Sequence, residues 1–282
     1  MRNSPASAAD YSSQSIARIR ATGRYVATAL GDLMEHVVVV GGLVPSLIID
    51  QHELPIGAPH HLGTMDLDLG FSLAILDHDR CATVDERLRR HKLLPDPRAV
   101  GLEAERRRCH NGPESSTMID LLVERTSDAD WEGQTLQLSP GLAAMVTPSL
   151  NVAFADCLSV TLSGEPGAEG CETNLVRVCG PGAFVVMKAI AFELRREDKG
   201  PKDAYDLYYV LRHYGAGITD VIDHFHAIGG FVDTARAKNI LRNHFSEPDA
   251  AGPKAVARFF GSRRDDAIQA DVAGLVRRLL GR

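Results

Sequence analysis

Residues 64–71, TMDLDLGF, alternate strictly between apolar and acidic or small side chains. Successive side chains on a β-strand point to opposite faces, so Leu67, Leu69 and Phe71 share one face while Asp66 and Asp68 share the other. The pattern predicts a strand with one face on a core and one face that carries two carboxylates. A chain with this strand needs neighbouring strands, and its fold must leave the acidic face accessible or neutralised.

Two further segments predict strands for the same sheet. Residues 36–42, HVVVVGG, are rich in β-branched side chains and end at two glycines, which is typical of a fully buried strand followed by a turn. Residues 116–124, STMIDLLVE, alternate again, and they place Asp120 on the face opposite Ile119. Asp120 is a lone charge among apolar neighbours, and buried carboxylates are rare unless they are paired or bind a metal.

The three aspartates suggest a cation site. Asp66 and Asp68 have Cβ atoms roughly 6–7 Å apart, and carboxylates so close repel each other unless a cation lies between them. Mg²⁺ prefers oxygen ligands and fills its shell with water and substrate phosphates. If a neighbouring strand presents Asp120 beside this pair, the three carboxylates suit a two-metal site for phosphoryl transfer. The alternative is an ordinary solvated strand face, which such a short pattern also fits.

Phosphate-binding features accompany the aspartates. Gly41 and Gly42 stand at the predicted strand-to-helix turn, where the backbone and the amides of the next helix can approach a phosphate. Ser46 adds a hydroxyl on the first turns of that helix. Lys188 lies in the apolar helical run FVVMKAIAF, where a lysine either extends its ammonium to water or reaches a phosphate as a point charge. Each feature alone also has a purely structural explanation.

The distribution of elements predicts an α+β protein with two domains. Residues 1–145 contain the predicted strands together with helices at 11–32 and 77–92. Around residues 125–150 the periodicity fades and two prolines occur, so we place a soft boundary there. Residues 146–282 contain two strand-like segments and then mostly helices, including one that follows the break at Gly200 and Pro201.

Composition narrows the class of protein. The net charge is −6, which disfavours wholesale coating of nucleic acid. A further strand is predicted around residues 102–110. Its basic segment AERRRCH, residues 104–110, is either a solvated strand or hairpin face or a local patch for nucleic acid. No apolar run approaches the roughly 18 residues of a membrane span, and the N-terminal residues lack the apolar core of a secretory signal. Five cysteines without C-x-x-C spacing favour a reducing cytoplasm over a disulfide framework or zinc site.

The motifs together resemble a known family. The order VVVVGGLVPSLIID, GTMDLDLGF and STMIDLLVE is similar to the nucleotidyltransferase superfold of the DNA polymerase β type. The continuation RVCGPGAFVVMKAIAFELRREDKGPKDAYDLYYVLR resembles the AbiEii-type toxin nucleotidyltransferases of abortive-infection and toxin–antitoxin systems. The resemblance spans roughly residues 35–215, and only the combined order of the motifs is specific.

The resemblance implies a nucleotidyltransferase-type mixed sheet followed by a mostly helical half that completes the site. It also implies a Mg²⁺-dependent enzyme that transfers a nucleotide from a nucleoside triphosphate (NTP) to an acceptor hydroxyl of tRNA, a protein or a small molecule, with an antitoxin as a further partner. In this scheme Asp66, Asp68 and Asp120 hold the metal, and Asp120 also helps to deprotonate the acceptor. The nucleotide-binding residues would be Gly41, Gly42, Ser46, Lys188 and Asp206.

Several alternatives stay open. Asp206 lies near the nucleotide, or orients Lys188, or instead forms a surface pair with Lys202 four residues earlier on one helix. Lys202 and Asp203 are weaker candidates. Pro45 departs from the usual family pattern. His60 and His61, in the loop of residues 51–63, either cover the site or are simply loop residues, and we favour the second. The rival functions are an antibiotic-type small-molecule nucleotidyltransferase, a metal-dependent hydrolase, and a non-catalytic nucleotide-binding protein.

Overall fold

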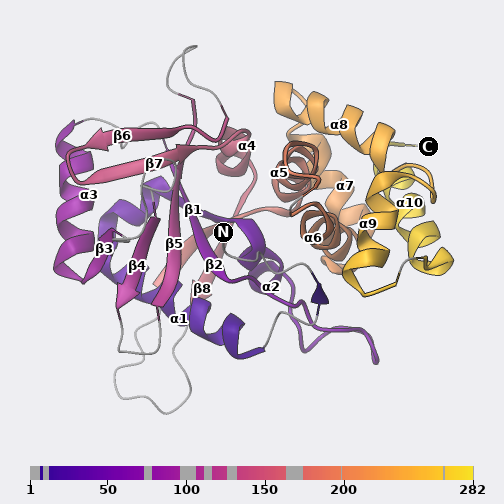
Figure 1. The fold of residues 1–282 in the computed structure, drawn as a ribbon, viewed down its shortest axis with the longest axis horizontal. Coiled ribbons are helices and arrows are strands. Elements are labelled where there is room, and N and C mark those ends of the chain that lie inside the picture. Colours follow the sequence, from indigo (N-terminus) through magenta and orange to yellow (C-terminus); the bar gives the residue numbers. More distant parts are fainter. Residues whose placement is uncertain are drawn as a thin grey trace. The chain divides into compact units, whose positions relative to one another are not determined.

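The computed structural model describes residues 7–8, 13–72, 78–95, 106–110, 116–125, 132–162, 174–197, 199–262 and 264–281. The chain forms two compact units, each assembled from separate segments (Figure 1). The sheet unit comprises Ser13–Val44 and Thr64–Cys179. The helical unit comprises Met1–Ser12, Pro45–Gly63 and Gly180–Arg282.

This division does not follow the predicted domains of residues 1–145 and 146–282. The strands at Cys157–Leu162 and Asn174–Cys179 pair with the sheet, so the sheet unit continues well beyond residue 145. In the other direction, the early segment Pro45–Gly63 belongs to the helical unit. Backbone pairing in the sheet therefore determines the division, and the low periodicity near residues 125–150 does not mark it.

The sheet unit is built on a mixed sheet in which the order β3-β4-β5-β2-β1-β9-β8 runs from one edge to the other. β2 is antiparallel to β1 and parallel to β5, while β6 and β7 form a hairpin attached to β5 through β7. The described strands are β1 (Val37–Val40), β2 (Asp66–Phe71), β3 (Leu93–Pro95), β4 (Arg106–His110), β5 (Ser116–Val123), β6 (Thr135–Ser139), β7 (Leu142–Val146), β8 (Cys157–Leu162) and β9 (Asn174–Cys179).

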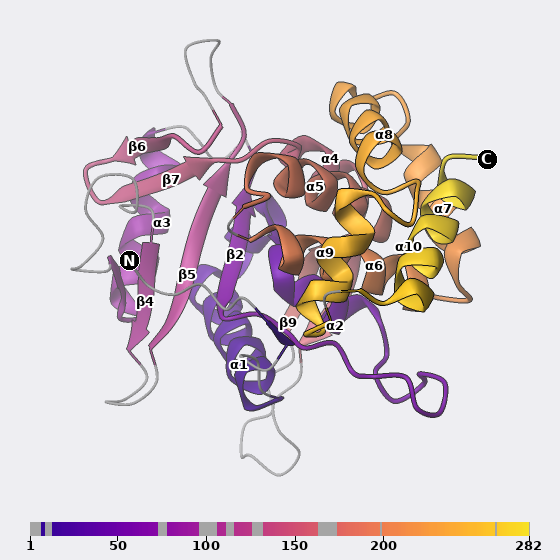
Figure 2. The same cartoon turned by 45° about the vertical axis from the view of Figure 1, so that its right-hand side comes forward.

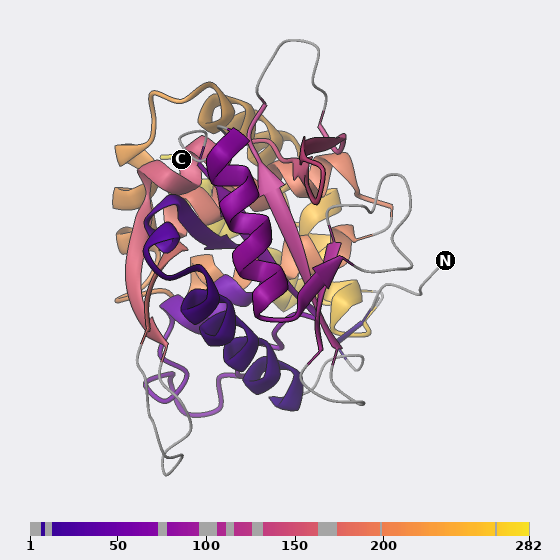
Figure 3. The same ribbon diagram turned by 90° about the vertical axis from the view of Figure 1, so that its left-hand side faces the viewer.

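Helices cover the apolar face of β2. α1 (Ser13–Leu30) and α3 (His78–Arg90) lie side by side over the sheet (Figure 3). A Cβ atom at Gly23 of α1 would lie 3.9 Å from Leu67, so α1 packs on the face of β2 that carries Leu67 and Leu69. The 3₁₀ helix η2 (Gly31–His36) leads from α1 into β1. Two other short helices in this unit are η3 (Gly41–Leu43) and α4 (Leu150–Ala155).

The helical unit consists of packed helices around an aromatic core. Tyr205 stacks on Phe259 at 4.6 Å between ring centroids, and Phe192 meets Phe245 edge-on at 4.8 Å. Pro181 and Pro201 stand in the first turns of their helices, where the missing N–H costs no hydrogen bond. Its helices are α5 (Pro181–Leu194), α6 (Gly200–His213), α7 (Ile218–Ala227), α8 (Val232–His244), α9 (Ala251–Phe259) and α10 (Asp266–Leu279), while α2 (Val44–Ile48) begins at the unit boundary.

These elements confirm the predicted α+β class, with a mixed sheet followed by a mostly helical C-terminal half. The predicted strands at residues 36–42, 64–71 and 116–124 are β1, β2 and β5. Three strands were not predicted: β3, which is only 3 residues long, and the β6–β7 hairpin in the segment that lacks periodicity. Within the part of the chain that the structure describes, no helix has both the length and the apolar character that a membrane crossing requires.

Candidate functional site

The acidic face of the sheet unit consists of Asp66 and Asp68 on β2 and Asp120 on β5. β2 and β5 are neighbouring parallel strands (Figure 2), and Asp68 is the register partner of Asp120, while Asp66 pairs with Met118. Register partners in a sheet carry their side chains on the same face. All three carboxylates therefore project from one face of the sheet, opposite the face on which α1 packs.

The absence of a side chain at Gly41 leaves room for the carboxylate of Asp68. Val40, the last residue of β1, is the register partner of Asp68, and the chain turns at once into η3 with a φ of +73° at Gly41. A Cβ atom at Gly41 would lie 1.8 Å from Asp68 Oδ2 and 2.7 Å from its Cγ. Any other residue would therefore have to adopt an unfavourable backbone conformation and displace this carboxylate. The first glycine of the pair accommodates an aspartate of the acidic face.

The three aspartates differ in burial. Asp120 is 6% exposed, whereas Asp66 and Asp68 are partly accessible. Among the described residues, no three His, Cys, Asp or Glu side chains are arranged to hold a metal ion by themselves. The three carboxylates are thus on adjacent strands and one face, but they are not a ready-made ligand set. Mg²⁺ usually takes only one or two protein carboxylates and fills the rest of its shell with other oxygen ligands, so the donor type fits this ion.

The remaining residues of the predicted phosphate turn are buried. Gly42 lies in η3, and Ser46 is in α2 with 4% of its surface exposed. Pro45 stands near the start of α2, as the sequence predicts. The basic segment AERRRCH falls largely outside what the structure describes: Ala104 and Glu105 are not described, and for residues 106–110 only the backbone of β4 is.

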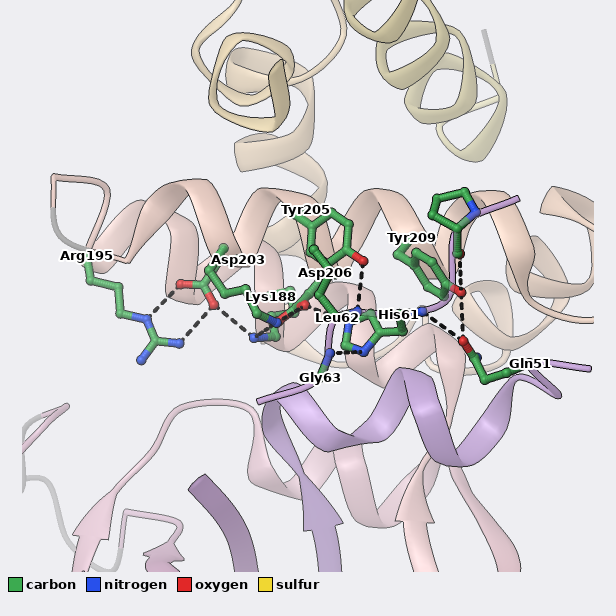
Figure 4. A network of polar contacts seen from close by, with 12 residues as sticks. Gln51, His61, Leu62, Gly63, Lys188, Arg195, Asp203, Tyr205, Asp206 and Tyr209 are labelled. Atoms are coloured by element: carbon green, nitrogen blue, oxygen red, sulfur yellow. Dashed lines mark hydrogen bonds and ion pairs between the residues drawn. The ribbon is translucent and has the colours of Figure 1, made fainter. Parts of the chain in front are cut away.

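The helical unit contains a second group of charges, the ion-pair cluster, which consists of Lys188, Arg195, Lys202, Asp203 and Asp206. Figure 4 labels all of these residues except Lys202. Lys188 Nζ lies 2.9 Å from Asp203 Oδ1 and 2.8 Å from Asp206 Oδ2. Arg195 donates to both oxygens of Asp203, at 2.7 and 2.9 Å. Lys202 donates to Asp206 Oδ1 one turn away on α6.

Burial of the cluster overturns the surface-pair alternative for Lys202 and Asp206. Asp206 is fully buried and Lys202 is 9% exposed, so their interaction is part of the interior of the helical unit. Lys188 is 6% exposed and has two carboxylate partners, so it does not extend to water. The contact between Asp206 and Lys188 is the one that an orienting role for Asp206 requires.

Each ionised state in the cluster depends on its partners. Burial by itself raises the pKa of Asp206, but the positive charges of Lys188 and Lys202 and the hydrogen bond from His61 outweigh it and lower that pKa below its ordinary value. Burial opposes the charge on Lys188, yet the carboxylates of Asp203 and Asp206 raise its pKa above the usual range. For Lys202 burial dominates and lowers the pKa.

His61 belongs to this environment, which the sequence did not indicate. It is 1% exposed, and its Nε2 lies 2.9 Å from Asp206 Oδ1. Its ring stacks on Tyr205 at 5.5 Å and meets Tyr209 edge-on at 4.9 Å. The view of His61 as a simple loop residue is therefore wrong, while the neighbouring His60 is exposed as expected.

Gln51 and the backbone near His61 anchor the same segment to α6. The Tyr209 hydroxyl donates to Gln51 Oε1 at 3.0 Å, and the backbone N–H of His61 donates to the same oxygen at 2.8 Å. The backbone N–H of Leu62 donates to the Tyr205 hydroxyl at 3.2 Å. Burial raises the pKa of Tyr209 to about 12, so this hydroxyl keeps its proton near neutral pH.

Comparison with known proteins gives a limited result. No protein-family model and no curated protein matches the chain. Among solved structures, the chain is similar to an antigenic nucleotidyltransferase-like protein from Paracoccidioides brasiliensis, with 12% sequence identity and a TM-score of 0.48. The similarity covers 92% of this chain and 98% of that one. At this identity and TM-score the likeness carries no argument about activity, which has to rest on the residues themselves.

Proposed function

We propose that the protein is a Mg²⁺-dependent nucleotidyltransferase that transfers a nucleotide from an NTP to an acceptor hydroxyl and releases pyrophosphate. The observation that carries the proposal is the acidic face: Asp68 and Asp120 are register partners on adjacent strands, and Asp66 projects from the same face. The left-handed Gly41, against which the Asp68 carboxylate packs, supports it. The order of motifs in the sequence points to the same chemistry.

In this mechanism the acceptor oxygen forms a bond to the α-phosphorus of the NTP as the bond from that phosphorus to the bridging oxygen of pyrophosphate breaks. Asp66, Asp68 and Asp120 would hold Mg²⁺ together with the triphosphate. The ion would neutralise part of the negative charge on the phosphates. Asp120 would accept the proton of the acceptor hydroxyl. Positioning and electrostatics account for most of the rate enhancement in such reactions.

The other proposed contacts concern the nucleotide. The backbone at Gly41 and Gly42 and the hydroxyl of Ser46 would bind phosphate oxygens, and Lys188, oriented by Asp206, would contact the triphosphate. The proposed acceptor is tRNA, a protein or a small molecule in the cytoplasm, and the resemblance to toxin nucleotidyltransferases adds an antitoxin as a proposed partner. Lys188→Ala is a poor probe of these contacts. It would remove the one ammonium that contacts both Asp203 and Asp206 in the protein interior, and the loss of a buried ion-pair partner also lowers stability.

The test is to incubate the protein with each of the four NTPs, labelled at the α-phosphate, together with Mg²⁺ and total cell extract. Label should enter one class of molecule, which nuclease and protease treatment identify, and a chelator should prevent the transfer. Asp66→Ala and Asp68→Ala should each lower the rate at least about 10³-fold, the upper range for loss of one preorganised electrostatic contact. Glu86→Gln, at an exposed glutamate on α3, is the matched control.

Different results identify the rival functions. Full activity of either aspartate variant would contradict the assignment of the acidic face. Release of nucleotide or phosphate without an acceptor would indicate a hydrolase. Binding of NTP by calorimetry without pyrophosphate release, in every extract fraction, would indicate a non-catalytic nucleotide-binding protein.

A further inference from the structure

His61 is held in one orientation by contacts on every side of its ring. Tyr205 covers one face of the imidazole and Tyr209 meets it edge-on. The backbone N–H of Gly63 lies 3.1 Å from Nδ1, and Asp206 Oδ1 lies 2.9 Å from Nε2 (Figure 4). All of these residues belong to the helical unit.

The two ring contacts define the tautomer. A backbone N–H only donates, so Nδ1 has to accept from Gly63 and carries no proton. A carboxylate only accepts, so Nε2 has to carry the proton and donate it to Asp206. His61 is therefore a neutral imidazole with its proton on Nε2. Burial agrees with this assignment, since it lowers the pKa of His61 to about 4.

The contact with His61 fixes how Asp206 presents its two oxygens. Oδ1 accepts from His61 and Lys202, while Oδ2 faces Lys188 Nζ at 2.8 Å. Rotation of this carboxylate would break the hydrogen bond from His61 and move the oxygen that Lys188 contacts. Because His61 is neutral, it holds the Asp206 carboxylate in place without adding a positive charge to a cluster that already contains Lys188, Lys202 and Arg195.

We propose that His61 is a positioning residue: by donating from Nε2 to Asp206 it holds that carboxylate against Lys188 and so sets the direction of the Lys188 ammonium for the triphosphate. This inference rests on the proposed nucleotidyl transfer. It assigns a role to the loop before β2, which anchors itself to α6 through Gln51 and Tyr209 as well.

The local geometry is tested without any activity, by ¹⁵N NMR of the histidine ring nitrogens in the wild-type protein. We expect His61 to show one protonated nitrogen, Nε2, at pH 7 and no titration near pH 6.5. Asp206→Asn should change the Nε2–H signal, whereas His60→Phe should leave it in place. Titration of His61 near pH 6.5, or a proton on Nδ1, would overturn the inference whatever the enzyme does.

The link to catalysis is tested with His61→Phe and His61→Gln. Phenylalanine keeps the ring but removes the donor, while the glutamine side-chain amide places an N–H near the position of Nε2. We expect kcat/KM for NTP to fall about 10- to 100-fold in His61→Phe, the range for loss of a group that orients a site residue. His61→Gln should recover most of that loss, and His60→Phe should match the wild type.

The outcomes separate the two proposals. If the wild type transfers nucleotide and His61→Phe is folded and equally active, the role of His61 is wrong and the proposed function stands. If His61→Gln loses as much activity as His61→Phe, the donor is not what matters, and the inference fails. If the wild type transfers nothing from any NTP, the proposed function fails and the catalytic role fails with it, while the NMR result still decides the geometry.

Discussion

The aspartates of the acidic face and those of the ion-pair cluster differ in burial and in their partners. On the acidic face, Asp66 and Asp68 project two residues apart from one strand and remain partly accessible. In the ion-pair cluster, Asp203 and Asp206 are at most 1% exposed, and each contacts at least two cationic side chains. Asp66 and Asp68 in the first arrangement are partly accessible to solvent, whereas the carboxylates of the second are paired with cations inside the protein. The difference predicts that mutations on the acidic face will lower activity with little change in stability, whereas mutations of charged residues in the ion-pair cluster will lower stability.

The largest stability effect should come from Asp206→Ala. The variant leaves Lys188 and Lys202 buried without the carboxylate that they share. Removal of one partner of a buried ion pair costs about 3–5 kcal/mol of unfolding free energy. Urea unfolding of the variant and the wild type measures this. Asp66→Asn on the acidic face is the matched comparison and should change the free energy of unfolding by no more than about 0.5 kcal/mol. Equal losses in the two variants would remove the distinction between the regions.

The next effect is a dependence of stability on pH that comes from His61. Its pKa in the folded protein is about 4, below the unfolded value of 6.5. The unfolded state therefore binds more protons between these values, and stability falls as pH drops from about 7 to 4, by about 3 kcal/mol from this residue. The charged groups that act on His61 are Asp206, Lys202 and Lys188.

Unfolding free energies at pH 7 and pH 4.5 for the wild type and His61→Gln test this dependence. The variant lacks the titrating ring, so its stability should fall less over the interval. His60→Phe should behave as the wild type does, because His60 is exposed. Parallel pH profiles for wild type and His61→Gln would contradict a buried neutral imidazole.

The smallest expected effect concerns Gly41→Ala. The φ of +73° costs an alanine about 1–2 kcal/mol, and the added Cβ would also displace the Asp68 carboxylate. Gly57→Ala is the control, because Gly57 has a φ of +86° with no atom within 4 Å of its added Cβ. Both variants should lose stability, Gly41→Ala by the larger amount because its Cβ also meets Asp68, but only Gly41→Ala should lose nucleotidyl transfer. Equal activity of the two variants would show that Asp68 does not need its place beside Gly41.

The sequence predicted the parts of the fold that rest on local pattern. Alternation in β2 and β5 predicted that Asp66 and Asp68 share one face of a strand and that Asp120 lies opposite Ile119. The pairing of β2 with β5, which brings Asp120 beside Asp68, came only from the structure. The β6–β7 hairpin was not predicted, because LAAMV in β7 contains two alanines and shows no alternation. The division into units was also beyond sequence reasoning, since it depends on which distant strands pair.

The environment of His61 could not have been predicted from local pattern. Its partner Asp206 is 145 residues away, and the contact exists only because the loop lies against α6. The spacing of Lys202 and Asp206 predicted an i,i+4 pair correctly, but the expected position at the surface was wrong. Burial decides how much such a pair matters, and the spacing does not reveal it. Lys188 likewise was identified as unusual among apolar neighbours, while its two carboxylate partners came from the packing of α5 on α6.

The discontinuous course of the chain has a consequence for how the protein is made. Pro45–Gly63 emerges from the ribosome long before α6, so Gln51 and His61 must wait for most of the remaining chain before their tyrosine and aspartate partners exist. Contacts of such wide sequence separation form late and slow the search for the native state. Until translation passes α6, this nascent segment lacks the α6 partners that anchor it in the folded protein.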